Sequence, residues 1–177
     1  WSRLGEYDRM LTEYQVAARI EPQNPRWQAS MADAYARLGN LVSALEAYQR
    51  AVELAPDTAE YWRLLAVFCA ENSVQAEEIG LPAAQQALSL APNDPGALDA
   101  IGYIYLSTGR YASAEEALKL AIEIAPEYYL AHIHLAMTYL AQGNQAAAFN
   151  LLTYVRDANS TGVYAETAQQ LLDKYFQ

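Results

Sequence analysis

The sequence predicts an all-α repeat protein, an α-solenoid of antiparallel helix pairs that ends in a C-terminal capping helix. Composition is the first observation: Ala supplies 34 of 177 residues, whereas 8 Gly and 7 Pro interrupt the chain, a balance that favours helix over sheet. The second is a common period, because prolines recur at intervals of 34, 36 and 34 residues and glycines at 34, 70 and 34. The positions are Pro22, Pro56, Pro92 and Pro126, and Gly5, Gly39, Gly109 and Gly143.

Further columns of similar residues share this period and locate one insertion. An aromatic column keeps the 34-residue period up to Cys69, whereas a column of small residues reaches Gly80 two positions later than that period predicts. We therefore expect a two-residue insertion between these positions, within 72–79. The aromatic column comprises Trp1, Tyr35, Cys69, Tyr105 and Tyr139, and a second small column comprises Ala17, Ala51, Ala87, Ala121 and Val155.

Each period is interpreted as two helices, and the copy at 95–128 shows this best. Asp94 offers a side-chain cap, and Pro95 stands at the first helical position, where the N–H that it lacks has no partner in any case. Gly109 predicts the end of the first helix, because glycine readily takes a left-handed conformation. Pro126 ends the second helix. Because the connecting turn is short, the two helices are expected to be antiparallel neighbours.

This register divides the chain into repeats and a cap. The divisions are a partial first repeat at 1–24, repeats at 25–58, 59–94, 95–128 and 129–162, and a capping helix at 163–177. The last segment has an apolar stripe and no later partner, so we expect it to cover the final repeat. Because Trp1 already stands in the aromatic column, we expect the first copy to lack most of its first helix. That loss predicts further repeats upstream or pairing with another chain.

The irregular third copy needs a separate interpretation. Pro82 would break its second helix if the ordinary register held throughout. We expect this helix to begin at Leu81 with Pro82 in its first turn, after a separate turn or loop over 74–80. Ser73 then stands where the other copies have Gly. The insertion is either merely tolerated or a functional loop at the edge of a groove.

Charge and cysteine content exclude several classes of partner and site. The net charge is −10 and the isoelectric point is about 4.5, so a nucleic acid or a membrane surface is a poor partner. The single Cys69 excludes an internal disulfide and a cysteine-based zinc site. Because the first residue is Trp1 rather than Met, we expect the chain to be a processed product or an excised piece.

The repeats resemble the tetratricopeptide repeat family over nearly the whole chain. The clearest copy of the family pattern reads Leu98, Ile101-Gly102, Tyr105, Ala114, Leu118 and Pro126. This resemblance implies a right-handed superhelix in which the first helix of each repeat lines a concave face. It also implies that an extended or helical peptide binds along that face. The fold is a platform, so the resemblance says less about function than about architecture.

Projecting the family's inner helix faces onto this sequence gives a candidate peptide-binding groove with a polar front and an apolar rear. We expect a ligand with polar groups toward the front and apolar anchors near Tyr103, Ile133 and Met137, because exposed apolar residues favour a covering partner. The alternative is that the rear residues pack against neighbouring repeats or the terminal helix. The candidate lining comprises Arg26, Ala29, Ser30, Asp33, Arg37, Glu60, Arg63, Leu64, Val67 and Glu71 in front, and Asp99, Ala100, Tyr103, Leu106, Ile133, His134, Met137 and Leu140 behind.

We find no pattern typical of catalysis, a cofactor or a metal. His132 and His134 are two residues apart, so on a helix they diverge and cannot share a metal ion, and we expect one to be packed and one to face the groove. Cys69 stands in a core column, which predicts a buried, inert thiol. The sequence favours a non-catalytic scaffold or adaptor that binds a protein or peptide partner, without direct membrane contact. The alternatives are the docking region of a larger enzyme or signalling protein, and a structural module that self-assembles through its uncapped N-terminal end.

Overall fold

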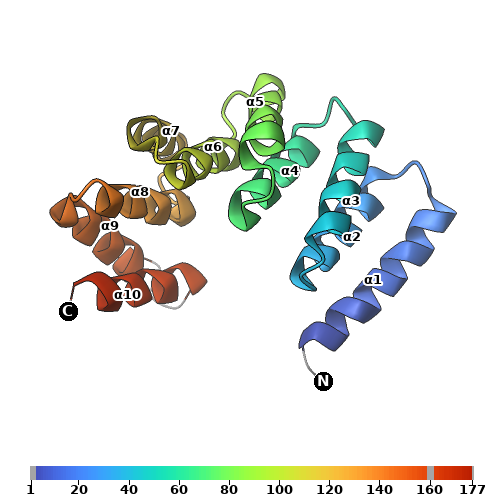
Figure 1. Ribbon diagram of the computed structural model, residues 1–177, viewed down its shortest axis with the longest axis horizontal. Helices are drawn as coiled ribbons and strands as arrows, with labels where there is room; N and C mark the ends of the chain where they lie inside the picture. Colours follow the sequence, from blue (N-terminus) through green and yellow to red (C-terminus); the bar gives the residue numbers. More distant parts are fainter. Residues whose placement is uncertain (1–2, 159–161, 177) are drawn as a thin grey trace. The chain divides into compact units, whose positions relative to one another are not determined.

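The computed structural model describes residues 3–158 and 162–176 and is all-helical over them (Figure 1). Within this part of the chain there is no β-strand, which confirms the predicted fold class. Trp1 lies outside the described residues. The helices are α1 (Arg3–Ile20), α2 (Pro25–Arg37), α3 (Leu41–Leu54), α4 (Ala59–Asn72), η1 (Ala76–Gly80), α5 (Leu81–Leu90), α6 (Pro95–Ser107), α7 (Tyr111–Ile124), α8 (Tyr129–Ala141), α9 (Gln145–Ala158) and α10 (Val163–Tyr175).

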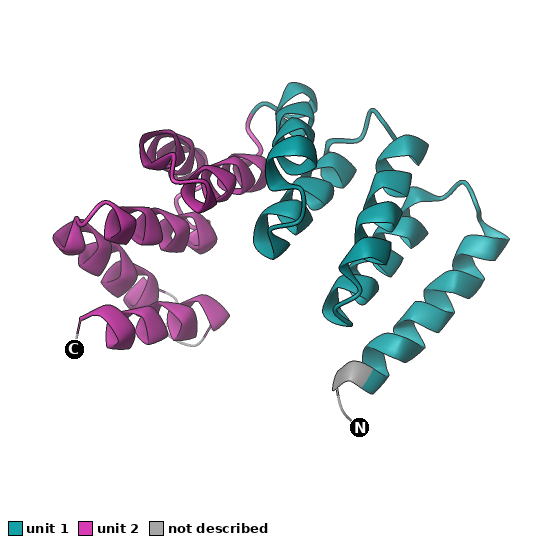
Figure 2. Cartoon of the chain, in the orientation of Figure 1, with its two compact units in different colours: residues 1–92 teal, residues 93–177 magenta. Residues whose placement is uncertain are grey.

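The chain divides into two compact units, unit 1 at Trp1–Pro92 and unit 2 at Asn93–Gln177 (Figure 2). In unit 1 each helix from α1 to α5 packs against the next one in the chain. In unit 2 the same holds from α6 to α10, and α6 also contacts α8. Both units are therefore stacks of helical hairpins with short connections, as the period predicts.

Side-chain caps begin two of the first helices, α2 and α6, and the cap of α6 is the predicted Asp94. The Asn24 side chain accepts a hydrogen bond from the Arg26 backbone N–H at 3.1 Å. The Asp94 carboxylate accepts one from the Gly96 N–H at 2.9 Å, and a proline follows each cap at the helix start. These side chains satisfy N–H groups that have no partner within the helix.

Most of the periodic glycines end first helices, and one does not. Gly39, Gly109 and Gly143 have φ angles of 78°, 76° and 79°, in the left-handed region that glycine tolerates best. Gly5 instead lies inside α1, which is continuous from Arg3 to Ile20. The period therefore fails to mark a turn at Gly5.

The third copy follows the sequence prediction at the start of its second helix, and a π-helical turn precedes that helix. The second helix, α5, begins at Leu81 with Pro82 in its first turn, as expected. Ser73 has a φ of 53° and fills the place of the missing glycine. Of the segment expected to be a separate turn or loop, Ala76–Gly80 forms the π-helical turn η1, which follows a second left-handed residue, Gln75, with a φ of 44°.

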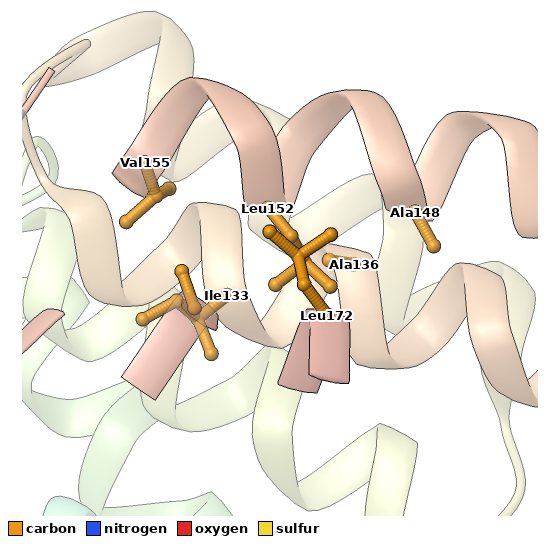
Figure 3. Close-up of a cluster of buried hydrophobic side chains, with 7 residues drawn as sticks. Ile133, Ala136, Ala148, Leu152, Val155 and Leu172 are labelled. Carbon is orange, nitrogen blue, oxygen red and sulfur yellow. The ribbon is translucent and has the colours of Figure 1, made fainter. Parts of the chain in front are cut away.

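Small residues let the helices of unit 2 approach closely. A Cβ atom built on Gly102 in α6 would lie 2.5 Å from Leu118 Cγ in α7, so this contact requires glycine. Farther along the unit, α10 packs on α8 and α9 as the expected cap. Figure 3 shows this core cluster, which comprises Ile133, Ala136, Ala148, Leu152, Val155, Ala168 and Leu172.

Candidate functional site

Unit 1 contains a cavity of about 450 Å³ between the first helices of two consecutive repeats. Helices α2 and α4 supply most of its wall, and α1 and α3 add one tyrosine each. Six of the residues projected from the sequence onto the front of the groove lie together here. The full lining is Tyr14, Arg26, Ala29, Ser30, Asp33, Tyr48, Glu60, Tyr61 and Leu64.

The two carboxylates of this cavity differ in their surroundings. Asp33 forms an ion pair with Arg37 at 2.9 Å, and this hydrogen bond raises the pKa of the Arg37 guanidinium. Arg37 also lies over the Tyr7 ring at 5.5 Å. Glu60 is exposed and forms no ion pair or hydrogen bond with any residue that the structure describes. A negative group is therefore available at the cavity for a ligand.

Tyr48 is the most buried polar side chain in the cavity wall. The residue is 6% exposed, and its ring packs against Phe68 at a centroid distance of 5.2 Å. Burial is the main cause that raises the pKa of the Tyr48 hydroxyl; the nearby Asp33 and Glu71 carboxylates raise it further, and Arg37 lowers it by a smaller amount. The hydroxyl therefore stays protonated and lies in a region of negative potential.

A second cavity of about 450 Å³ lies within unit 2 and is largely apolar. Its wall comes from the C-terminal parts of α6, α8 and α10. Lys174 supplies its cationic group and lies over the Tyr175 ring at 4.8 Å. The lining is Leu106, Met137, Leu140, Ala141, Leu171, Lys174 and Tyr175.

Several rear residues of the projected groove are packed inside unit 2. Asp99 and His134 are 3% and 8% exposed, and 2.8 Å separates the Asp99 carboxylate from His134 Nδ1. The half-buried Tyr103 stacks on the His134 ring at 4.3 Å. Ile133 belongs to the core cluster and Ala100 is also buried. For these residues the structure shows the internal packing that the sequence left open as an alternative.

Some of the other residues projected onto the groove line a cavity, and others do not. Leu106 and Met137 line the cavity of unit 2, as does Leu140. Arg37, Arg63 and Val67 do not line the cavity of unit 1. The expectation of one groove-facing histidine is wrong, because His132 is buried too, with its Nε2 atom 2.9 Å from the Pro126 carbonyl oxygen.

Sequence reasoning missed several residues that line the cavities. Tyr14 and Tyr48 are 34 residues apart, so the period contained a signal for them, but both lie on second helices. Tyr61 follows Glu60 directly in α4 and lines the same cavity. In unit 2, Lys174 and Tyr175 come from the capping helix, which the sequence interpretation treated purely as a cover.

The structure also bears on metal, thiol and membrane chemistry. In the described ranges there is no group of three or more His, Cys, Asp or Glu residues that could hold a metal ion. Burial raises the pKa of the Cys69 thiol to about 12, so the thiol stays protonated, as expected of an inert core cysteine. None of the helices described is both long enough and apolar enough to cross a bilayer.

Comparisons with known proteins agree on the fold. Two tetratricopeptide repeat models match residues 4–67 and 95–128. The human PEX5-related protein is 33% identical over 104 residues, which cover 58% of this chain and 16% of that protein. The chain thus spans a small part of the length of this relative.

Two solved structures extend the similarity over nearly the whole chain. TTC0263, a thermophilic TPR protein of Thermus thermophilus, has a TM-score of 0.80 at 22% identity, and the match covers 96% of this chain and 92% of that one. YrrB, described as a TPR protein with an unusual peptide-binding site, has a TM-score of 0.64 at 19% identity. That match covers 94% of this chain and 84% of YrrB.

Proposed function

Because the chain belongs to the tetratricopeptide repeat family, we propose that it is a non-catalytic scaffold that binds a peptide segment of a partner protein along its first helices. The observation that supports this proposal most is the cavity of unit 1, where Arg26, Ser30 and Asp33 of α2 face Leu64 of α4. The peptide-binding site named for YrrB supports the same kind of function.

The cavity described in each unit suits a different kind of peptide group. In unit 1 the wall is polar and aromatic, so we assign it to a polar group of a peptide; Arg37, Arg63 and Val67 stay proposed contacts outside this lining. In unit 2, Leu106 and Met137 suit an apolar anchor. The buried residues of unit 2 support this surface: Asp99 and His134 join α6 to α8, with Tyr103 stacked on His134, and Ile133 packs α8 against α9 and α10.

The expected affinity is modest. A peptide that buries roughly 500 Å² of apolar surface gains about 12 kcal/mol at about 25 cal/mol per Å². Association and ordering cost on the order of 4–15 kcal/mol, so the surplus corresponds to dissociation constants of about micromolar. Such values suit reversible assembly.

Peptides selected on this protein from a random phage library test the proposal. The variant Ser30→Arg fills the cavity of unit 1 with a long side chain, and Ser89→Arg makes the same change on the exposed part of α5, outside both cavities. We expect Ser30→Arg to weaken the selected peptides at least tenfold and Ser89→Arg to leave them unchanged, as measured by fluorescence anisotropy. Equal affinity for both variants would refute binding at this site.

One observation favours self-assembly as a second candidate function. On α1, Val16 is 50% exposed and Ile20 is 75% exposed, which leaves apolar area for another copy to cover. Sedimentation equilibrium over a wide concentration range decides the matter, with Val16→Glu as the variant that should abolish association. A monomer at the highest concentration removes this candidate. The docking role within a larger protein stays a further alternative.

A further inference from the structure

The cavity of unit 1 contains a hydroxyl group for which the protein supplies no partner. Tyr48 is more than nine-tenths buried, at 6% exposure, and its oxygen forms no hydrogen bond with a described residue. Among the described residues, two side-chain polar atoms are shielded from solvent and have no hydrogen-bond partner, namely His132 Nδ1 and Thr153 Oγ1. The Tyr48 oxygen is therefore not sealed, and it reaches the cavity that this residue lines. A polar group of this kind favours a ligand that completes its hydrogen bonding.

The charges around this hydroxyl favour a cationic ligand group. Asp33 and Glu71 contribute negative potential at Tyr48, Arg37 contributes a smaller positive one, and Glu60, which has no ion pair with a described residue, lines the same cavity. Arg37 pairs with Asp33, and Arg26, which also lines the cavity, lies over the Trp27 ring at 5.5 Å. Arg63, three residues after Glu60 in α4, has an interaction of its own and forms none with Glu60. Glu60 thus has no counter-ion among the described residues of unit 1, which leaves a place for a positive group from outside.

The aromatic wall narrows the choice between the two common cations. Tyr14 and Tyr61 line the cavity beside the carboxylates. A guanidinium is planar, is weakly hydrated, stacks on aromatic faces and binds carboxylates through two N–H groups, whereas an ammonium is a compact and strongly hydrated point charge. A cavity of about 450 Å³ also has room for a long side chain and part of its backbone.

We propose that the unit 1 cavity binds an arginine side chain of the partner peptide, with its guanidinium at the Glu60 carboxylate and the Tyr48 hydroxyl, between the rings of Tyr14 and Tyr61. This inference rests on the proposed peptide-binding function and adds the chemistry of the ligand to it. The Tyr48 oxygen acts as the acceptor, since a guanidinium has N–H donors and no acceptor. Asp33, held by Arg37, adds attraction from the side of α2.

The test uses the peptides selected from the phage library, resynthesised with each arginine replaced in turn by citrulline, which has nearly the same shape and no charge. The variants are Glu60→Gln and Tyr48→Phe. The matched control is Glu46→Gln, which removes the same charge from an exposed glutamate of α3 outside the cavity. Glu60 is exposed, so its substitution leaves the fold intact even if Tyr48→Phe destabilises it.

We expect that replacement of one particular peptide arginine by citrulline lowers the affinity for the unsubstituted protein about tenfold. On Glu60→Gln the same replacement should lower affinity less than threefold, because the partner charge is already gone. Tyr48→Phe should weaken the arginine peptide about threefold, and Glu46→Gln should have no effect on either peptide.

Three results would overturn the inference: selected peptides that need no arginine, peptides in which lysine serves equally well, and an arginine effect that persists in full on Glu60→Gln. A loss of binding on Ser30→Arg together with any of these results would overturn the arginine assignment and leave the proposed function standing. Binding that Ser30→Arg does not alter would overturn both.

Discussion

The substitution Gly102→Ala tests the packing on which the helical hairpins depend. The added Cβ would lie 2.5 Å from Leu118 Cγ and 2.8 Å from Cδ2, whereas ordinary contacts begin near 3.4 Å. Leu118 is fully buried and its Cγ atom cannot turn away without moving the whole side chain. Forcing extra atoms into a packed core costs about 1–3 kcal/mol. Replacing a helical glycine by alanine returns about 0.5–1 kcal/mol, so the two ranges leave a net loss of up to about 2.5 kcal/mol.

Urea denaturation followed by circular dichroism measures this loss, and Gly5→Ala is the matched control. Gly5 also lies in a helix, but a Cβ there meets nothing within 4 Å, so this variant should be unchanged or more stable by up to about 1 kcal/mol. The opposite signs at two helical glycines distinguish a packing effect from helix propensity. If Gly102→Ala were as stable as Gly5→Ala, the close α6–α7 contact would be refuted.

Three further predictions concern backbone strain, thiol reactivity and acid stability. Ser73→Gly relieves a left-handed residue with a φ of 53° and should raise the free energy of unfolding by about 0.5–1 kcal/mol in the same urea assay. Cys69, with a pKa of about 12 against a usual 9.0, should react with a disulfide reagent on the order of a thousandfold more slowly in the native protein than in urea. A hydrogen bond from Lys119 lowers the pKa of Glu115, so this carboxylate stabilises the fold above pH 4.5, its ordinary value, and loses that effect on acidification. Glu115→Gln should therefore cost about 0.5 kcal/mol at about pH 7 and nothing at about pH 2, as measured by urea denaturation at each pH.

The fold could be predicted because the starts and ends of its helices have local physical causes. Asp94 and Pro95 begin α6, and Gly109 ends the turn after it, whatever the rest of the chain does. The same locality explains the errors. Gly5 matches the period but lies inside α1, where a Cβ added to it would have no contact within 4 Å. The π-helical turn at Ala76–Gly80 accommodates an insertion whose length does not fit a full α-helical turn, and no residue pattern marks it.

The candidate site could be predicted better in unit 1 than in unit 2. Helical projection placed Ser30 and Leu64 on corresponding faces of consecutive first helices, and both line the cavity of unit 1. In unit 2 the same projection selected Asp99 and His134, which meet each other because α6 contacts α8 directly. Successive residues of an α-helix are rotated by about 100°, so a residue on the groove face and one that packs between repeats can be direct neighbours in the sequence. Projection alone therefore does not distinguish the two faces.

Amide relaxation caused by a nitroxide attached to the end of a selected peptide tests the central claim most directly. The account predicts broadened signals at Ser30, Asp33 and Leu64 within unit 1, and none at the exposed Val42 of α3. Broadening centred on Val42, with the three cavity residues unaffected, would contradict it.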